Sequence, residues 1–275
     1  MSIFKPTQWK QWTVILMAVG LGAGTLQAQL TYSNGLRLWL KADAGVTTNA
    51  SGQVSSWADQ STNGFIVSQG TDSLKPLWVD DQMGGQPVLR FDGVDDLLNN
   101  TTLNLLSGVS PRTIFIVAEQ NSGDDGGALF TFRRSVRVQS WQERVLNATT
   151  SRIVDDGNTR FHNTTNTSAI VTNAFATIYA WSGGLSNWLN GVQLTVTGTG
   201  LFDENGATGF TIGNREDAAG LGWPGDLSEI LVYNHVLAAS DRQGVYEYLV
   251  EKYALPEPSA ALLLAVGGLL LFRRR

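Results

Sequence analysis

The stretch Leu227-Ser228-Glu229-Ile230-Leu231-Val232-Tyr233 is short, rich in aliphatic residues and preceded by turn residues. Such a run predicts a β-strand. Six further runs are short, rich in β-branched and aromatic residues, and separated by Gly, Asn, Asp and Ser clusters: residues 36–40, 88–91, 113–119, 128–132, 177–181 and 209–212. The 30 glycines suit a sheet protein with many turns. The sequence therefore predicts an all-β fold.

Two local signals add detail to this fold. Asn190-Gly191 predicts a tight β-hairpin, because both residues tolerate the positive φ of a type I′ turn. Near the end of the chain, Ser240 and Gln243 have the spacing of a capping box at a helix start. Apolar residues then recur on one helical face: Val245, Tyr246, Leu249, Val250 and Tyr253. We expect one C-terminal helix packed on the sheets.

Length, charge and cysteine content limit the classes of function. Residues 29–254 make up 226 positions, a size that all-β sandwiches often fill as one domain. Loss of Lys5, Lys10 and the three terminal arginines would lower the 19 Lys and Arg to 14 against 24 Asp and Glu, a net charge near −10. This balance argues against nucleic acid as a partner. The absence of cysteine excludes disulfides, thiolate metal sites and a cysteine nucleophile.

The N-terminus has the layout of a secretory signal peptide. Lys5 and Lys10 form a positive region before an apolar run at residues 14–23, and Ala28 offers a small residue at a cleavage point. An uncleaved anchor helix is the alternative. Either form would place the following domain outside the cytoplasm.

The C-terminal tail consists of Pro256-Glu257-Pro258, an apolar run of 13 residues (260–272) and Arg273-Arg274-Arg275. Thirteen residues are fewer than the ~18–20 that comfortably span a bilayer, although snorkelling arginines allow a short run to insert. The tail resembles the PEP-CTERM sorting signal of Gram-negative bacteria, which an exosortase reads. The resemblance implies an exosortase-type processing enzyme as a partner, transient anchoring in the inner membrane, and a final place at the cell surface or in the extracellular matrix.

Four ordered blocks carry a second resemblance. They are residues 36–43 (LRLWLKAD), 54–61 (VSSWADQS), 88–96 (VLRFDGVDD) and 225–233 (GDLSEILVY). They resemble bacterial laminin-G-like domains, which have a concanavalin A-like jelly-roll fold. The resemblance implies a two-sheet antiparallel jelly-roll sandwich with one C-terminal helix packed on it. Three parts follow: a signal peptide at 1–28, the jelly-roll domain at 29–254, and the sorting segment at 255–275.

The third block contains a candidate metal site. Asp92, Asp95 and Asp96 are clustered, and calcium prefers oxygen ligands that loops often supply. Some laminin-G-like domains bind calcium at a loop rim, so the resemblance makes Asp95 and Asp96 candidate Ca²⁺ ligands. Aspartate and glycine are also ordinary turn residues. The alternative is a structural block with Phe91 and Val94 in the core.

Catalytic patterns are weak. Glycoside hydrolases of the β-glucanase type carry Glu-x-Asp-x-Glu on one strand, and no such run occurs here. We expect Glu229 to form an ion pair with an arginine. There is no Gly-x-Ser-x-Gly elbow, and His162, in an expected polar loop, and His235, at a strand end, form no catalytic motif. We expect a non-enzyme. A glycan-cleaving enzyme is the alternative, recognisable by two carboxylates about 5–10 Å apart in a groove.

Exposed aromatic side chains typically stack on sugar rings, and two tryptophans are candidates for this role. Trp223 lies in a glycine-rich loop, residues 218–225, with little to bury it, and Trp141 lies beside Arg137 and Arg144. The alternative is that Trp223 packs back onto the core, because tryptophan carries a large apolar area.

The sequence as a whole favours an exported, non-enzymatic protein that binds an extracellular polysaccharide or is structural in the matrix. Residues 147–172, rich in Asn, Thr and Ser, are expected to form polar loops. A surface adhesin that binds protein is a further alternative, which a broad apolar patch at the rim would favour.

Overall fold

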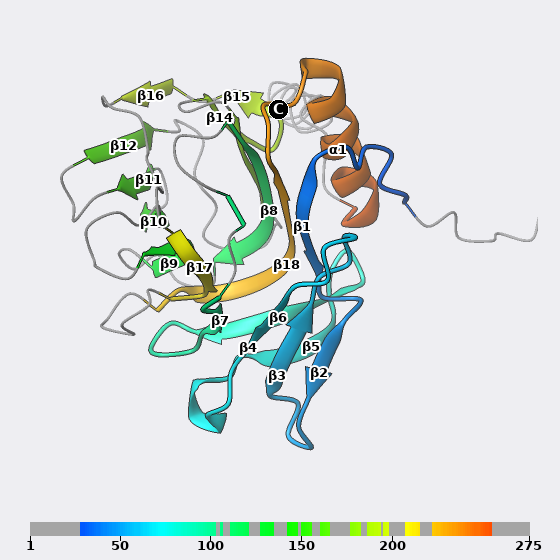
Figure 1. The fold of residues 1–275 in the computed structure, drawn as a ribbon, viewed down its shortest axis with the longest axis vertical. Coiled ribbons are helices and arrows are strands. Elements are labelled where there is room, and N and C mark those ends of the chain that lie inside the picture. Colours follow the sequence, from blue (N-terminus) through cyan, green and yellow to red (C-terminus); the bar gives the residue numbers. More distant parts are fainter. Residues whose placement is uncertain are drawn as a thin grey trace, which may run out of the picture.

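The computed structural model describes residues 28–102, 105–106, 111–120, 127–134, 142–147, 150–155, 160–165, 177–182, 186–193, 195–197, 207–214 and 222–254. Within these residues the strands form an eight-stranded and a ten-stranded sheet, and neighbouring strands pair antiparallel (Figure 1). The two sheets face each other across a common core, and the C-terminal α-helix of the described residues lies on the outer side of the smaller sheet. The predicted two-sheet antiparallel sandwich with a C-terminal helix is confirmed.

The smaller sheet is built around β18 (Pro224–Tyr233), which contains the stretch quoted first from the sequence. One edge of β18 pairs with β8 (Thr113–Gln120), and the other pairs with β6 (Gln86–Asp92) and then with β1 (Leu36–Lys41). The sheet continues through β13 (Thr177–Ser182), β14 (Ser186–Leu189) and β15 (Val192–Gln193) beyond β8, and through β5 (Leu77–Met83) beyond β6.

The larger sheet follows a path that begins and ends on short strands. Its order is β16 (Thr195–Thr197), β12 (Arg160–Thr165), β11 (Thr150–Asp155), β10 (Gln142–Asn147), β9 (Gly127–Arg134), β17 (Ala207–Ile212), β7 (Leu98–Asn100), β4 (Ile66–Ser68), β3 (Val54–Ala58) and β2 (Val46–Thr48). A short 3₁₀ helix (Asp72–Leu74) lies between β4 and β5.

In the centre of the smaller sheet, β8 and β18 are buried on both faces, which explains why most of β8 is a continuous apolar run. Ile114 and Ile116 of β8 point into the core between the sheets, while Phe115 and Val117 point toward the helix. The core between the sheets also contains the fully buried Trp57. The strand period of two thus supplies two separate apolar layers from one sheet.

The helix α1 (Ala239–Lys252) covers the outer layer, but it begins differently from the prediction. Ala238 occupies the N-cap position and makes no side-chain cap, so the predicted capping box of Ser240 and Gln243 is wrong. Gln243 instead bonds Glu247 at 3.1 Å. The predicted hairpin at Asn190-Gly191 is confirmed, because both residues have positive φ (47° and 77°) between β14 and β15.

Two further expectations are corrected by the fold. Residues 147–172 contain the whole of β11 and β12 rather than only polar loops, and His162 lies in β12 opposite Ile153. Their threonines and branched residues suit strands, and pairing with neighbouring strands satisfies the backbone. Val94, expected in the core, is 64% exposed.

Candidate functional site

The connection between β6 and β7 brings three carboxylates together. Gly93, at φ 81°, follows Asp92 and lets the chain turn so that Asp95 and Asp96 approach it. One carboxylate oxygen from each aspartate lies within 4.8 Å of the other two. Asp92 Oδ1 accepts hydrogen bonds from the backbone N–H groups of Val94 (2.8 Å) and Asp95 (3.3 Å). The structure therefore brings together the two predicted ligands, with Asp92 as a third member of this acidic loop.

Asp96 is the buried member of the acidic loop. It is 7% exposed, and its Oδ2 accepts the backbone N–H of Asp92 at 2.9 Å. Burial raises the pKa of Asp96 to about 6, and the charges of Asp92 and Asp95 act in the same direction, against the lowering effect of the Asp92 N–H. Ionised carboxylates at this spacing repel one another, so a cation among them would be favourable.

The donor set of the acidic loop fits calcium. Oxygens within 4.8 Å of one another can all touch one Ca²⁺, because Ca–O distances are about 2.3–2.6 Å. Three carboxylates provide fewer than the six to eight oxygens that calcium takes, so solvent or backbone oxygens would complete the shell.

Trp223 is not the exposed aromatic residue that the sequence predicted. It is 1% exposed, and its ring packs against Phe91 with centroids 6.2 Å apart. A Cβ on Gly225 would lie 2.6 Å from the indole, and one on Gly127 would lie 2.4 Å from the Trp223 Cα. The glycines thus let neighbouring backbone close over a large ring, and Trp223 is a core residue. Trp141 lies outside the described residues.

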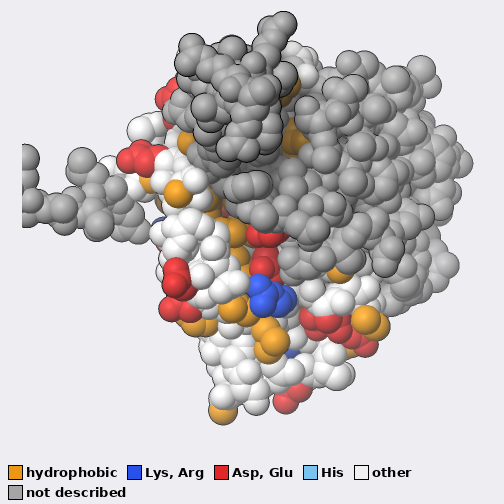
Figure 2. All heavy atoms as spheres, turned by 180° about the vertical axis from the view of Figure 1, so that it is seen from behind, with side chains coloured by type: hydrophobic (Ala, Val, Ile, Leu, Met, Phe, Trp, Pro, Cys, Tyr) orange, Lys and Arg blue, Asp and Glu red, His pale blue; other side chains and the backbone are white. Residues whose placement is uncertain are grey.

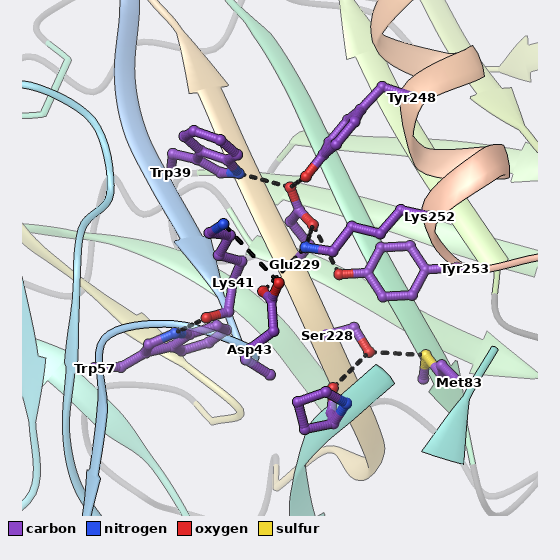
Figure 3. Close-up of polar contacts among 12 residues, drawn as sticks. Trp39, Lys41, Asp43, Trp57, Met83, Ser228, Glu229, Tyr248, Lys252 and Tyr253 are labelled. Carbon is purple, nitrogen blue, oxygen red and sulfur yellow. Dashed lines mark hydrogen bonds and ion pairs between the residues drawn. The ribbon is translucent and has the colours of Figure 1, made fainter. Parts of the chain in front are cut away.

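A buried carboxylate joins the C-terminal helix to the smaller sheet (Figure 3). Glu229 of β18 is 0% exposed. Its Oε1 accepts hydrogen bonds from the indole N–H of Trp39 (2.6 Å) and the hydroxyl of Tyr248 (2.8 Å). Its Oε2 accepts from the ammonium of Lys252 (2.8 Å) and the hydroxyl of Tyr253 (2.7 Å). These five residues, the Glu229 cluster, connect β1, β18 and α1.

The charges around the Glu229 cluster balance. Lys252 Nζ lies 2.8 Å from Glu229 Oε2 and 3.0 Å from Asp43 Oδ1, while Asp43 Oδ2 lies 3.9 Å from Lys41 Nζ. Burial, followed by the charge of Glu229, raises the pKa of Tyr248, so its hydroxyl stays protonated and donates. Two cations therefore match two carboxylates.

The ion pair expected between Glu229 and an arginine is wrong, because Glu229 faces α1, where Lys252 is its partner. An ion pair with an arginine does occur on β18, but at Asp226, three residues before Glu229. Asp226 accepts two hydrogen bonds from Arg90 of β6, at 2.7 and 2.6 Å. A bulge between Leu227 and Glu229 separates these two positions.

A pocket of about 310 Å³ lies beside the Glu229 cluster. The residues before β1, the end of β1 with the turn after it, and the last turns of α1 form its walls. Its lining consists of Ala28, Gln29, Leu30, Trp39, Lys41, Asp43, Tyr248 and Lys252. Ala28, the predicted end of the signal peptide, is thus part of a wall. Sequence reasoning missed this pocket, although its Trp39, Lys41 and Asp43 come from the first resembling block.

Asp43 and Glu229 are two carboxylates that share the ammonium of Lys252, and they can be compared with the carboxylate pair expected of a glycan-cleaving enzyme. Glu229, however, is fully buried, is not among the pocket-lining residues, and has two donors on each oxygen. A carboxylate in this state cannot meet a substrate. The geometry gives Glu229 a structural role.

The surface in Figure 2 carries acidic side chains in several separate groups over the described residues. No helix among these residues is long and apolar enough to cross a bilayer. The sorting residues Pro256, Glu257, Pro258, Arg273, Arg274 and Arg275 lie outside the described part of the chain.

No protein-family model matches the sequence, and no curated protein is significantly similar to it. Among solved structures, the binding domain of Paraclostridial Mosquitocidal Protein 1 matches 78% of this chain at 12% identity and a TM-score of 0.55. The binding domain of botulinum neurotoxin serotype G matches 78% at 8% identity and the same TM-score, 0.55. This chain covers about half of each, 52% and 51%.

A third similar structure is domain 4 of AbnA, a GH43 extracellular arabinanase from Geobacillus stearothermophilus, in complex with arabinotriose. It matches 78% of this chain and 97% of that domain, at 14% identity and a TM-score of 0.50. At such identities the likeness concerns the fold. The chain is thus similar in fold to domains described as binding domains and to one solved with a bound oligosaccharide.

Proposed function

We propose that this chain is an exported, non-enzymatic module of the cell surface or extracellular matrix that binds a carbohydrate. The observation that carries the proposal is the likeness in fold to AbnA domain 4, which was solved with arabinotriose and is matched over 97% of its length. The buried, fully bonded state of Glu229 supports a binding role over a catalytic one.

Calcium is part of this proposal. The acidic loop would hold Ca²⁺ through Asp92, Asp95 and Asp96, and the ion would neutralise the carboxylates and order the loop at the sandwich rim. Exposed Val94 stands beside these carboxylates in the same loop.

A glycan array with the purified full-length chain, run with calcium and with EDTA, tests the binding function. We expect reproducible binding to a set of related glycans. Absence of binding in both conditions would reject the hypothesis of carbohydrate binding and leave a structural or protein-binding domain. Hydrolysis of a bound glycan would instead show that the chain is an enzyme.

The calcium part has its own test in thermal unfolding. Calcium at 100 times its dissociation constant should stabilise the folded chain by about 2.7 kcal/mol, because it binds only the folded loop. Asp95→Asn should abolish this gain. Asp81→Asn is the matched control, since Asp81 is an exposed aspartate outside the acidic loop. An equal calcium effect in both variants would reject the acidic loop as the site.

Processing completes the proposal. The tail and leader would be removed during export, the tail by an exosortase-type enzyme after transient anchoring in the inner membrane of a Gram-negative envelope. Intact-mass analysis of the exported chain tests this: we expect a protein that begins at Gln29 and lacks the terminal arginines. A chain that retains residues 1–28 would support the uncleaved anchor instead.

A further inference from the structure

The pocket beside the Glu229 cluster has two polar groups whose hydrogen-bonding capacity is unused. Lys41 Nζ and Asp43 Oδ2 lie 3.9 Å apart, which is too long for a direct hydrogen bond. Asp43 Oδ1 is bonded to Lys252, but among the described residues no donor bonds Oδ2 and no acceptor bonds Lys41 Nζ. The Lys41 and Asp43 side chains are 20% and 15% exposed, so both groups are reachable from the pocket.

These two groups are complementary to a hydroxyl group. A hydroxyl oxygen can accept a hydrogen bond from an ammonium and donate one to a carboxylate at the same time. Two hydrogen bonds of about 2.8 Å from one oxygen easily bridge atoms that are 3.9 Å apart. A pair of adjacent hydroxyls, one on each group, fits as well.

The charge of the pocket favours a neutral ligand. Lys252 is shared between Glu229 and Asp43, and Lys41 lies beside Asp43, so the four charges compensate one another. An anionic ligand would meet the Asp43 carboxylate without a spare cation. A cationic ligand would meet Lys41 in the same way.

Two aromatic residues, Trp39 and Tyr248, also line the pocket. The rings of Trp39 and Tyr248 meet edge to face, with centroids 6.4 Å apart. The bonds from both side chains to Glu229 fix these rings in place. Lys41 Nζ lies 4.9 Å from the centroid of the Trp39 ring, so aromatic surface and a hydroxyl-binding group adjoin in the pocket. A sugar ring matches this combination, because its C–H faces are apolar and its edges carry hydroxyls.

We infer that this pocket binds one neutral sugar unit of a glycan, with Lys41 donating to and Asp43 accepting from its hydroxyls. The volume of about 310 Å³ is enough for one ring with its hydroxyls. This inference rests on the proposed carbohydrate-binding function and assigns it a site separate from the acidic loop. The pocket lies on the helix side of the smaller sheet.

The test is a titration of the full-length chain with arabinose, xylose, glucose, galactose and mannose. Binding is measured by calorimetry and by the shift of the indole N–H resonance of Trp39. The test variant is Lys41→Met. Arg37→Met is the matched control, because Arg37 is a cation on the same strand and bonds Asn63 instead of lining the pocket. Lys41→Met removes the ion pair with Asp43 (3.9 Å) and the contact of the ammonium with the Trp39 ring (4.9 Å to its centroid), but no hydrogen bond. The unfolding midpoints of both variants are therefore measured beside their affinities, which separates weaker binding from lost stability.

We expect at least one of these sugars, or a glycan identified on the array, to bind the wild type and Arg37→Met equally and Lys41→Met at least tenfold more weakly. A glycan that binds all three proteins equally would overturn the pocket as its site while the proposed function stands. No sugar binding to the wild type in titration and array would overturn the proposed function and the pocket together.

Discussion

At the scale of single residues, Glu229 determines how the helix is held. Its carboxylate receives four donors, one from β1 and three from the end of α1, and Trp39 and Lys252 among them can act only as donors in these contacts. Any side chain that replaces Glu229 must therefore accept on both of its ends. Only a carboxylate of the same length meets that requirement.

This requirement predicts the effect of Glu229→Gln. An amide offers one oxygen and one NH₂ group, so in either orientation the NH₂ faces Trp39 on one side or Lys252 on the other. We expect a loss of about 3–5 kcal/mol in the free energy of unfolding, as for other broken buried ion pairs. Urea denaturation measures this loss.

The matched control is Glu247→Gln, the same change at an exposed position of α1. We expect it to alter the free energy of unfolding by less than about 0.5 kcal/mol, as surface substitutions usually do. Similar losses in both variants would contradict the role assigned to the Glu229 cluster.

Asp96 predicts a pH dependence of stability. Its pKa is about 6 in the folded protein against an ordinary value of 3.8, so the folded state binds the proton more tightly. The resulting stabilisation is fully present below about pH 3.8 and is lost as the pH rises through 6. Asp96→Asn should therefore gain stability relative to the wild type between pH 4 and pH 7.5 in EDTA.

Urea unfolding of both proteins at the two pH values checks this. Asp81→Asn serves again as the exposed control and should follow the wild type. An Asp96→Asn variant whose stability difference from the wild type is the same at both pH values would contradict the burial of an ionisable Asp96.

At the scale of elements, α1 packs against the hairpin of β14 and β15. The Tyr246 hydroxyl donates to the backbone oxygen of Asn190 at 2.9 Å. A Cβ on Gly191 would lie 2.8 Å from Tyr246 Cζ. Gly191 thus has two reasons to be glycine, its φ of 77° and the approach of the helix.

Comparison with Gly64 separates these two reasons. Gly64 has a similar φ of 69°, but a Cβ there would meet nothing within 4 Å. Gly64→Ala should cost about 1–2 kcal/mol, the strain of a left-handed conformation alone. Gly191→Ala should cost clearly more, because the Tyr246 ring must also move, and thermal or urea unfolding of both variants measures the difference. Equal costs would mean that α1 does not press on the hairpin.

The elements also show what could be predicted from the sequence. Residues 36–40, 113–119 and 227–233 are predictable strands, because a buried strand needs only a short apolar run bounded by turn residues. The start of α1 was misplaced, since a capping signal at Ser240 does not reveal that the chain from β18 already enters the helix at Ala239. Local patterns identify an element more reliably than its ends.

At the scale of the whole molecule, the misplaced site residues share one cause. Trp223 was expected at the surface because its neighbours are glycines, yet those glycines allow backbone from distant strands to close over it. The lysine partner of Glu229 was missed because Lys252 lies 23 positions away, on an element that packs back over β18. The burial of a side chain and its pairing with another element depend on tertiary structure. A short stretch of sequence does not contain this information.

The acidic loop is the opposite case. Asp92, Asp95 and Asp96 are near neighbours in the chain, so one turn suffices to bring their oxygens within 4.8 Å. The sequence could therefore predict the cluster. By contrast, the pocket draws on residues 28–30, 39–43 and 248–252, and only the folded chain brings these together.

The position of Glu229 also has a mechanical consequence. A force applied to the chain beyond residue 254 acts first on Tyr253 and Lys252. Both side chains transmit it to the carboxylate of Glu229, to which they are hydrogen-bonded. Glu229 lies on β18 and is paired at this point with Lys41 of β1 and Val117 of β8, so the force is shared among three strands. When the domain is pulled from its C-terminus, we therefore expect its peripheral strands to unfold before the contact between α1 and β18 breaks. In Glu229→Gln this contact is weaker, so single-molecule pulling from the C-terminus should show a lower first rupture force than in the wild type.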